Sequence, residues 1–431
     1  MKRILWVCNT PLPEIQRKVG VKQYNEGWLI GISNQLRQKK DIDFHYAFPQ
    51  TKFKETLERT IDGITFWGFY DCHKNMYKIE KESIEIFHSI IKKINPDIIH
   101  IFGTEYLHSL ECVSSISDKR KIIVSLQGLT SEIAKVYTNG IPIGARLAGR
   151  FKSGKYQCLL TEQYDFYKSG VNEKKILLNI QNVIGRTHWD RKCVEKINPE
   201  CRYYHCNETL REVFYEGTWN IEGIQRHSLF ISQAHYSIKG LHILISALPL
   251  IKRRYPDTMV YVAGWKTFDD ENTPYGHYIR KLLKKYHVEK NIVSMGCLTD
   301  EKVKQRLLKA HIMLMPSIIE NSPNSIGEAM LLGTPVVAAD VGGIPSILHD
   351  KIEGYLYPGM DEKKLAQKVC KIFESDKLAL YFSKNGKKRA GELYSKSHNI
   401  EQLLEIYQTV GESGKKQKNK IASGKRSELD E

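Results

Sequence analysis

Two glutamates in the C-terminal half of the chain, Glu320 and Glu328, could bind a sugar nucleotide. They flank Ser322 and Pro323, where we predict that a helix begins, because hydroxyl residues cap helices and proline fits the first helical position. The free N–H groups at such a helix start attract phosphate. Carboxylates accept hydrogen bonds from sugar and ribose hydroxyls. The alternative is an ordinary βαβ unit whose glutamates are solvated.

The elements around this stretch would position both carboxylates. Residues 312–315 form an apolar run that predicts a buried parallel strand just before Glu320. The helix that carries Glu328 should end at Gly333, because glycine commonly follows the last helical turn. Residues 336–339 predict the next strand, and Gly342 and Gly343 predict a turn after it. The order is therefore strand, loop, helix, strand, with one carboxylate before the helix and one within it.

This pattern resembles the donor-site signature of the retaining glycosyltransferases of family 4, which have the GT-B fold. The residues that carry the resemblance are Glu320, Glu328-Ala329-Met330, Gly333-Thr334-Pro335-Val336-Val337-Ala338 and Gly342-Gly343. It implies transfer of a sugar, with retained configuration, from a nucleotide-diphosphate sugar to a glycan or lipid-linked glycan. It also points to bacterial surface or capsular polysaccharide synthesis. Such enzymes generally need no metal or cofactor.

The resemblance also implies which residues bind the donor. Lys239 and Gly240 match the family's lysine–glycine pair beside the diphosphate, while Gln233 stands where the family has a basic residue. Either His235 or Arg186 replaces that missing charge, or the donor binds less tightly. Glu320 is expected to position the donor sugar and Glu328 the ribose. The other expected donor contacts are Gly20, Gly296, Asn321, Ser322, Asn324 and Ser325.

Strands and helices alternate along the whole chain, which predicts parallel sheets. We expect an α/β protein with two Rossmann-like, doubly wound domains that face each other across a cleft. The expected parts are an acceptor-side domain (1–225), a donor domain (226–395), a helix that returns to the first domain (396–410) and a disordered polar tail (411–431).

The first half offers fewer signals. Glu105 and His108 follow a predicted strand at residues 97–103, and either could steer the acceptor hydroxyl. The alternatives are a helix-start residue and a packed histidine. Arg186 follows an apolar run, 176–184, that we interpret as a strand. It could clamp a phosphate or an acidic sugar, or it could form a structural pair with Asp190.

The net charge of +16 favours anionic partners, and the excess is spread over both halves of the chain. A nucleic-acid-binding protein would instead concentrate basic and aromatic residues on one face, so we expect no nucleic-acid partner. A sugar-nucleotide epimerase with the same fold remains an alternative. Residues 133–161 contain five basic residues, no acid and several apolar residues, which predicts either an anionic membrane contact or a solvated surface.

Cysteine usage and hydropathy address where the protein works. Nine scattered cysteines fit reduced thiols in the cytoplasm, and no apolar run is long enough to span a bilayer. We therefore expect a cytoplasmic protein, peripheral on the inner face of the membrane. The histidines and cysteines between 188 and 206 have none of the common zinc spacings, so no metal site is expected.

Overall fold

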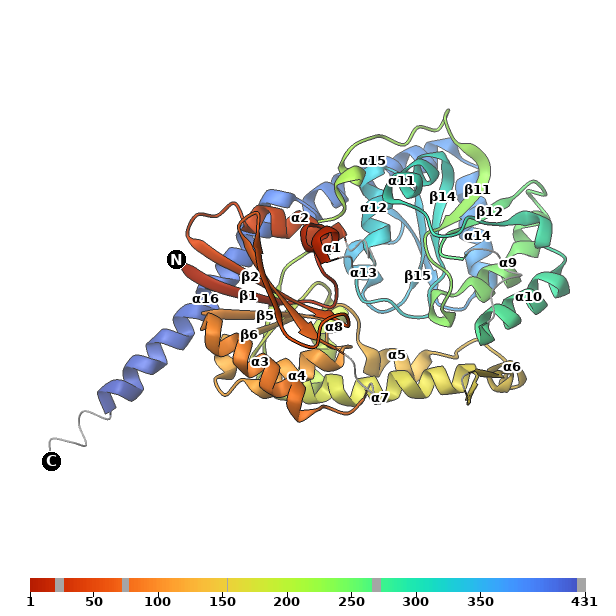
Figure 1. Cartoon of the computed structure of the whole chain (residues 1–431). Helices are drawn as coiled ribbons and strands as arrows, with labels where there is room; N and C mark the ends of the chain where they lie inside the picture. The colour runs from red at the N-terminus through yellow and green to blue at the C-terminus, as the bar shows by residue number, and fades with distance from the viewer. Residues whose placement is uncertain (20–26, 72–76, 153, 266–272, 425–431) are drawn as a thin grey trace.

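The protein consists of two α/β lobes that lie side by side, with a long helix running beneath both of them (Figure 1). The computed structural model describes residues 1–19, 27–71, 77–152, 154–265 and 273–424. No helix in this described part is both long and apolar enough to cross a bilayer.

The first lobe is built on an eight-stranded sheet in the order β10-β9-β6-β5-β1-β2-β4-β3, in which only the β3–β4 pair is antiparallel. Its strands are β1 (Lys2–Val7), β2 (Ile42–Gln50), β3 (Leu57–Ile61), β4 (Ile64–Tyr70), β5 (Ile98–Phe102), β6 (Ile122–Ser125), β9 (Asn182–Gly185) and β10 (Arg202–His205). Its helices are α1 (Pro13–Val19), α2 (Gly27–Leu36), α3 (Lys81–Ile94), α4 (Leu107–Ser115), α5 (Thr130–Val136), α6 (Ile143–Leu147), α7 (Leu159–Leu178) and α8 (His188–Ile197), and β7 (Arg150–Lys152) pairs with β8 (Lys155–Gln157) in a hairpin.

The second lobe is built on a six-stranded, wholly parallel sheet in the order β13-β12-β11-β14-β15-β16. Its strands are β11 (Gln225–Ile231), β12 (Met259–Val262), β13 (Ile292–Ser294), β14 (Ala310–Met315), β15 (Val336–Asp340) and β16 (Gly354–Pro358). Its helices are α9 (Leu241–Lys252), α10 (Pro274–Tyr286), α11 (Asp300–Lys309), α12 (Asn324–Leu332), α13 (Ile344–Ile347), α14 (Glu362–Phe373) and α15 (Asp376–Leu393). Counted within the lobe, the strand order is 3-2-1-4-5-6, that of a dinucleotide-binding fold.

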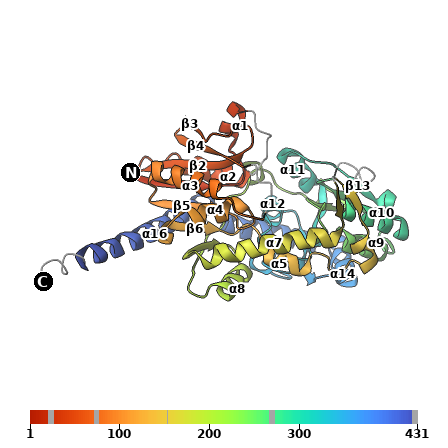
Figure 2. The same cartoon turned by 60° about the horizontal axis from the view of Figure 1, so that its bottom comes forward.

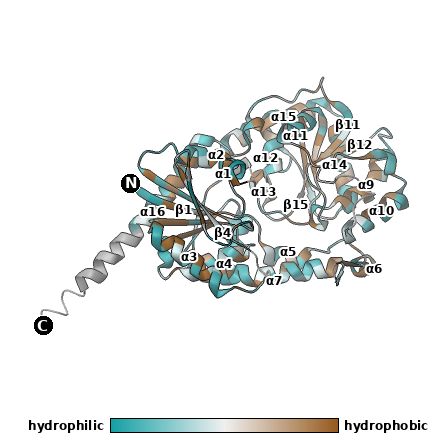
Figure 3. Ribbon diagram, in the orientation of Figure 1, coloured by the Kyte–Doolittle hydropathy of each residue, from teal (hydrophilic) through white to brown (hydrophobic). Residues whose placement is uncertain are grey.

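Hydrophobic burial explains the two layered cores. Strand β14 is buried along its whole length, as expected for a central parallel strand covered on both faces by helices. Figure 3 shows the hydrophobic colouring gathered on the strands between the outer helices. The two parallel sheets confirm the expected fold class, and each sheet has its own core on either face.

Two segments join the lobes outside the sheets. The segment from α5 to α7 extends from the first lobe beneath the second, as the rotated view shows (Figure 2). Its Tyr137 is buried among second-lobe side chains, and the Tyr137 carbonyl accepts a 2.6 Å hydrogen bond from the Ser237 hydroxyl. In the opposite direction, α16 (Lys396–Gly424) leaves the second lobe and packs on the first, where the Tyr407 hydroxyl accepts a 2.8 Å hydrogen bond from the Trp6 indole.

Three local expectations differ from the structure. Helix α12 begins at Asn324, one residue later than expected, with Pro323 rather than Ser322 at the N-cap. The apolar run 176–184 is divided between the last turn of α7 and strand β9. Helix α16 continues past its contact with the first lobe to Gly424, so much of the segment expected to be a disordered tail is helical. Residues 425–431 lie outside the described residues.

Candidate functional site

The strand orders place a switch point in each lobe, and the two switch points face one cleft. In the second lobe, β11 and β14 are adjacent strands. After β11 the chain continues to β12 on one side of the pair, and after β14 it continues to β15 on the other side, so the loops that follow the two strands diverge and form a crevice. Those loops carry Lys239 and Glu320. In the first lobe, β1 and β5 have the same relation, and the loops after them carry Asn9 and Glu105. All four residues line one cavity of about 440 Å³ between the lobes.

Lys239 and Glu320 form an ion pair at the second-lobe switch point. The Lys239 ammonium lies 2.7 Å from Glu320 Oε1, and the Ser317 hydroxyl donates a 2.9 Å hydrogen bond to the same oxygen. Both charged side chains are mostly buried, with 19% and 10% of their surfaces exposed. The pair therefore places one cation and one anion at the edge of the cleft, within reach of a charged ligand.

Close backbone contacts hold this pair in place. Gly240 has a φ of +71°, and a Cβ at that position would lie 1.8 Å from the Pro316 carbonyl oxygen. Only glycine allows the loop after β11 to approach the loop after β14 so closely. On the other side, the Gly343 N–H donates a 3.0 Å hydrogen bond to the Glu320 carbonyl. The glycines of the motif thus fix the backbone that carries Lys239 and Glu320.

The start of helix α12 opens into a second cavity, of about 530 Å³, beside this pair. Pro323, Asn324 and Ser325 line it together with Lys239 and Glu320. No side chain caps the helix, so its first N–H groups and its positive dipole end are directed toward the cavity. This combination of a lysine and a helix start suits a phosphate-bearing ligand.

Glu328 lines the same cavity but is already held by an arginine. Arg211 donates two 2.7 Å hydrogen bonds, one to each Glu328 carboxylate oxygen, and also pairs with Asp300 at 2.5 Å. Burial raises the pKa of Glu328, and the hydrogen bonds from Arg211 oppose that rise. Each carboxylate oxygen retains a second acceptor site that a ribose hydroxyl could use.

Arg186 does not reach the Lys239 side of the cleft. Its guanidinium pairs with Glu208 at 2.5 Å and donates to the Leu126 carbonyl at 3.1 Å, while Asp190 contacts only its backbone N–H. Glu208 therefore takes up the charge of Arg186 in this structure, and the alternative of a side-chain pair with Asp190 does not form. The role of Arg186 as a phosphate clamp stays a prediction.

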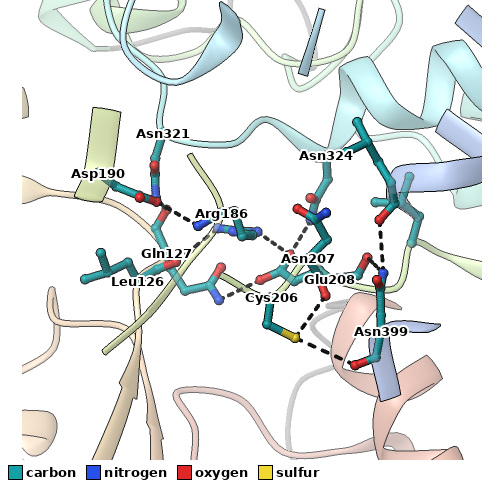
Figure 4. A network of polar contacts seen from close by, with 12 residues as sticks. Leu126, Gln127, Arg186, Asp190, Cys206, Asn207, Glu208, Asn321, Asn324 and Asn399 are labelled. Carbon is teal, nitrogen blue, oxygen red and sulfur yellow. Dashed lines mark hydrogen bonds and ion pairs between the residues drawn. The ribbon is translucent and has the colours of Figure 1, made fainter. Parts of the chain in front are cut away.

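Glu208 is the centre of a polar network that joins the two lobes (Figure 4). Besides Arg186, it accepts hydrogen bonds from Gln127 of the first lobe at 2.8 Å and from Asn324 of helix α12 at 2.9 Å. Asn321 accepts a 3.2 Å hydrogen bond from Thr187 of the first lobe. The side chains of Asn321 and Asn324 are thus engaged between the lobes, while the first backbone N–H groups of α12 still face the helix-start cavity.

The acceptor-side candidates lie on the first-lobe wall of the cleft. Glu105 lines both the Lys239 cavity and a larger cavity of about 940 Å³, and the buried His108 lines only the larger one. Tyr106 stacks against His108 with ring centroids 5.3 Å apart, and Asn9 donates a 2.6 Å hydrogen bond to the Tyr106 hydroxyl. His235 lines the larger cavity and the helix-start cavity, so it stands between them.

The structure thus brings most of the predicted residues to one cleft. Gln233 lines it with an exposed side chain, and Ser322 lines it beside Asn321. Gly296 lies just behind it, where its carbonyl accepts a 2.9 Å hydrogen bond from the Gly264 N–H. Gly20 lies outside the described residues. The sequence does not single out Arg211, because its two acidic partners, Glu328 and Asp300, are remote along the chain.

Comparisons with known proteins agree with this geometry. Residues 218–389 match the family model described as glycosyl transferases group 1. YtcC of Bacillus subtilis, which is named as a glycosyltransferase, is 25% identical over 381 residues, or 82% of this chain and 88% of that protein. An uncharacterized glycosyltransferase of Methanocaldococcus jannaschii is 26% identical over 193 residues, and the match covers 44% of this chain and only about half (47%) of that protein.

A solved structure shows the same fold. The HepE protein of Anabaena, in complex with UDP and glucose, matches with a TM-score of 0.67 and 14% identity, over 95% of this chain and 100% of that one. The likeness at this identity concerns the fold, while the family model carries the catalytic class. Over residues 218–389 the chain is thus a group 1 (family 4) glycosyltransferase, a family of retaining enzymes, and the chain as a whole has the GT-B fold.

Proposed function

We propose that the protein transfers a sugar from a nucleoside-diphosphate sugar to a glycan, or to a lipid-linked glycan, in surface polysaccharide synthesis. The observation that carries this proposal is the position of Lys239, Glu320 and the uncapped start of α12 at one switch point. Uridine is the first base to test, because the Anabaena protein of the same fold holds UDP.

The diphosphate would lie between Lys239 and the first N–H groups of α12. As the sugar–phosphate bond breaks, negative charge grows on the leaving diphosphate, and preorganised donors stabilise that charge. Lys239 has three N–H donors, so it can keep its bond to Glu320 while it binds a phosphate oxygen. Gln233 has no charge, and the described residues that line the helix-start cavity include only two lysines or arginines, Lys239 and Arg211.

Glu320 would bind hydroxyls of the donor sugar, and Glu328 the ribose. Lys239 and Ser317 orient the Glu320 carboxylate, and Arg211 orients that of Glu328. Such fixed acceptors bind a polyol without the entropy cost of ordering free side chains. Glu105 and His108, across the cleft, are the residues that we propose to steer the acceptor hydroxyl.

We further propose how the chain divides this work. Residues 1–225 would form the acceptor side and residues 226–395 the donor side, and the helix that begins after them would tie the two together. The Glu208 network supports this division, because it links α12, which flanks the diphosphate position, to the opposite lobe. Donor binding at α12 would then favour a closed cleft that excludes water.

A lipid-linked acceptor would bring the protein to the cytoplasmic face of a membrane, and the outer face of α7 supports this proposal. Tyr164, Tyr167, Val171 and Leu178 are each at least 39% exposed, and their spacing places them on one stripe of the helix. Lys174 and Lys175 are exposed beside them. Apolar and tyrosine side chains next to lysines suit an anionic lipid surface.

Vesicle co-sedimentation tests the membrane contact. We expect the full chain to bind phosphatidylglycerol vesicles at low salt, and Tyr164→Ser with Tyr167→Ser to weaken that binding. Tyr381→Ser, a similarly exposed position on α15, is the matched control and should bind as the wild type does. Equal binding to phosphatidylcholine vesicles, or no effect of the α7 substitutions, would contradict the proposal.

The transferase proposal is tested by calorimetric titration with UDP, followed by a search for transfer from UDP-sugars to glycan acceptors. We expect UDP to bind and the transferred sugar to keep its anomeric configuration. Conversion of the donor to an epimer without any acceptor would favour the epimerase alternative. Absence of binding by every common nucleoside diphosphate would contradict the proposal.

A further inference from the structure

Helix α2 of the first lobe reaches the cavity at the start of α12, on the side where we place the ribose (Figure 1). Gly27, the first residue of α2, lines that cavity together with Arg211 and Glu328. We propose that Gly27 is a positioning residue for the donor ribose, because its lack of a side chain lets Arg211 hold Glu328 in the orientation that binds the ribose hydroxyls. This inference rests on the proposed transferase function and concerns how the first lobe controls the donor site.

Two glycines give α2 a flat face against the chain that joins the lobes. Gly27 and Gly31 lie four residues apart and therefore on the same side of the helix. A Cβ on Gly31 would lie 3.2 Å from the methyl carbon of Thr209. A Cβ on Gly27 would lie 2.2 Å from Cγ of Arg211 and 2.8 Å from its Cδ, far closer than the roughly 3.5–4.0 Å of ordinary carbon contacts. The stem of the Arg211 side chain thus occupies the space that a side chain at position 27 would need.

The second lobe fixes the segment that carries Arg211 from the other side. Leu210 and Phe214 are buried in a hydrophobic core of the second lobe. The guanidinium carbon of Arg211 lies 4.7 Å from the centre of the Phe214 ring, which is a cation–π contact. Arg211 therefore lies between α2 of the first lobe and a buried ring in the core of the second lobe.

This position directs the Arg211 guanidinium at two carboxylates. Its Nε and Nη2 atoms each donate a 2.7 Å hydrogen bond to one oxygen of Glu328, and its Nη1 atom pairs with Asp300 at 2.5 Å. A two-point contact fixes the plane of the Glu328 carboxylate as well as its distance. The Glu328 side chain is only 5% exposed and lines the cavity, so a ribose bound there meets a carboxylate of fixed orientation.

A side chain at position 27 would disturb this arrangement. The methyl group of an alanine would have to displace the Arg211 stem. Because the guanidinium moves with the stem, its two hydrogen bonds to Glu328 would lengthen or break. The loss would fall on the ribose hydroxyls, whereas Lys239 and the start of α12, which we place at the diphosphate, would keep their positions.

The preference of the full chain for a ribose with its hydroxyls tests the inference. The two ligands are UDP and 2′,3′-dideoxyuridine 5′-diphosphate, which lacks both ribose hydroxyls, and each is titrated by calorimetry at pH 7. We expect the wild type to bind UDP at least about tenfold more tightly than the analogue, because hydrogen bonds to a charged acceptor are lost with the hydroxyls. Gly27→Ala should reduce this preference at least about threefold by weakening UDP binding, and should leave the affinity for the analogue within about twofold of the wild type.

Gly391→Ala is the matched control for Gly27→Ala. Gly391 is exposed near the end of α15, and apart from the backbone of its own helix a Cβ there would have no heavy atom within 4 Å. This variant should keep the wild-type preference for UDP. An unchanged preference in Gly27→Ala would overturn the inference. Equal weakening of both ligands would also overturn it, because the added methyl group would then obstruct the cavity as a whole.

Arg211→Lys tests the same contact from the other side and does not depend on the folding of Gly27→Ala. Lysine keeps a positive charge beside Glu328 but has no planar fork, so the preference for UDP should fall at least about threefold. An unchanged preference in this variant would overturn the role of Arg211.

The wild-type titrations separate the two proposals. Absence of binding by both nucleotides would contradict the transferase function itself. Equal binding of the two nucleotides by the wild type would leave the transferase function standing and overturn only the control of the ribose contact by Gly27 and Arg211.

Discussion

The pair of Lys239 and Glu320 allows the roles of its two members to be separated. Lys239→Met removes the ammonium but keeps the length of the side chain. A hydrogen bond to a charged group contributes about 1.5–3 kcal/mol, so the loss of the lysine–phosphate contact should weaken UDP binding by about 10- to 150-fold. Lys239 is mostly buried, at 19% exposure, so salt should screen little of this effect.

Glu320→Gln should behave in the opposite way. The carboxylate lies 2.7 Å from the lysine and repels an incoming diphosphate, so the amide should leave UDP affinity within about threefold of the wild type or increase it. Transfer should nevertheless fall by about 100-fold or more, since the donor sugar loses a fixed charged acceptor. Isothermal titration with UDP and a transfer assay measure the two quantities separately.

The contrast between the two variants decides the outcome. Both proteins must first show cooperative thermal unfolding near the wild-type temperature. UDP binding that is unchanged in Lys239→Met would refute the assignment of the lysine to the diphosphate. A loss of UDP affinity in Glu320→Gln as large as that in Lys239→Met would refute the separation of roles.

Three further predictions concern the framework of the site, and chemical denaturation measures each. Gly240→Ala should lower the free energy of unfolding by at least about 2 kcal/mol, because φ is +71° and the new Cβ would meet the Pro316 carbonyl. Arg211→Met should lower the free energy of unfolding by about 3–5 kcal/mol, because it leaves Glu328 buried without its partner. The double variant Arg211→Met with Glu328→Met should recover much of that loss. Burial raises the pKa of Glu328 above its ordinary value of 4.5, so in Arg211→Met the folded protein binds the Glu328 proton more tightly than the unfolded chain does. The free energy of unfolding of this variant should therefore fall as the pH rises above about 4.5. Tyr407→Phe should lower the free energy of unfolding by about 1–3 kcal/mol, because the lost hydroxyl hydrogen-bonds to Trp6 and His100 and so links α16 to the first lobe.

The second lobe is the part that the sequence predicts best. Its strands are short apolar runs between helices, and the spacing from Glu320 to Gly343 matches a family signature. The fold class and the family follow from these features and are confirmed. The one-residue error at the start of α12 has a simple cause: Ser322 and Pro323 fit the pattern of a capped helix, but the chain stays extended at Pro323.

The first lobe is predicted less well, because its key contacts join residues that are distant in sequence. Arg186 has an acidic neighbour at position 190, yet it pairs with Glu208, which only the folded chain brings near. The apolar run 176–184 contains no glycine or proline between the end of α7 and the start of β9, so its sequence does not show where the helix ends and the strand begins. The lining of the large cavity likewise comes from residues between 71 and 275, and no single sequence motif predicts it.

The most direct test of the central claim is a crystal structure of the full chain with UDP. We predict that the diphosphate lies within hydrogen-bonding distance of Lys239 and of the first backbone N–H groups of α12, with the ribose beside Glu328. A diphosphate bound elsewhere, with Lys239 still bonded only to Glu320, would contradict the account.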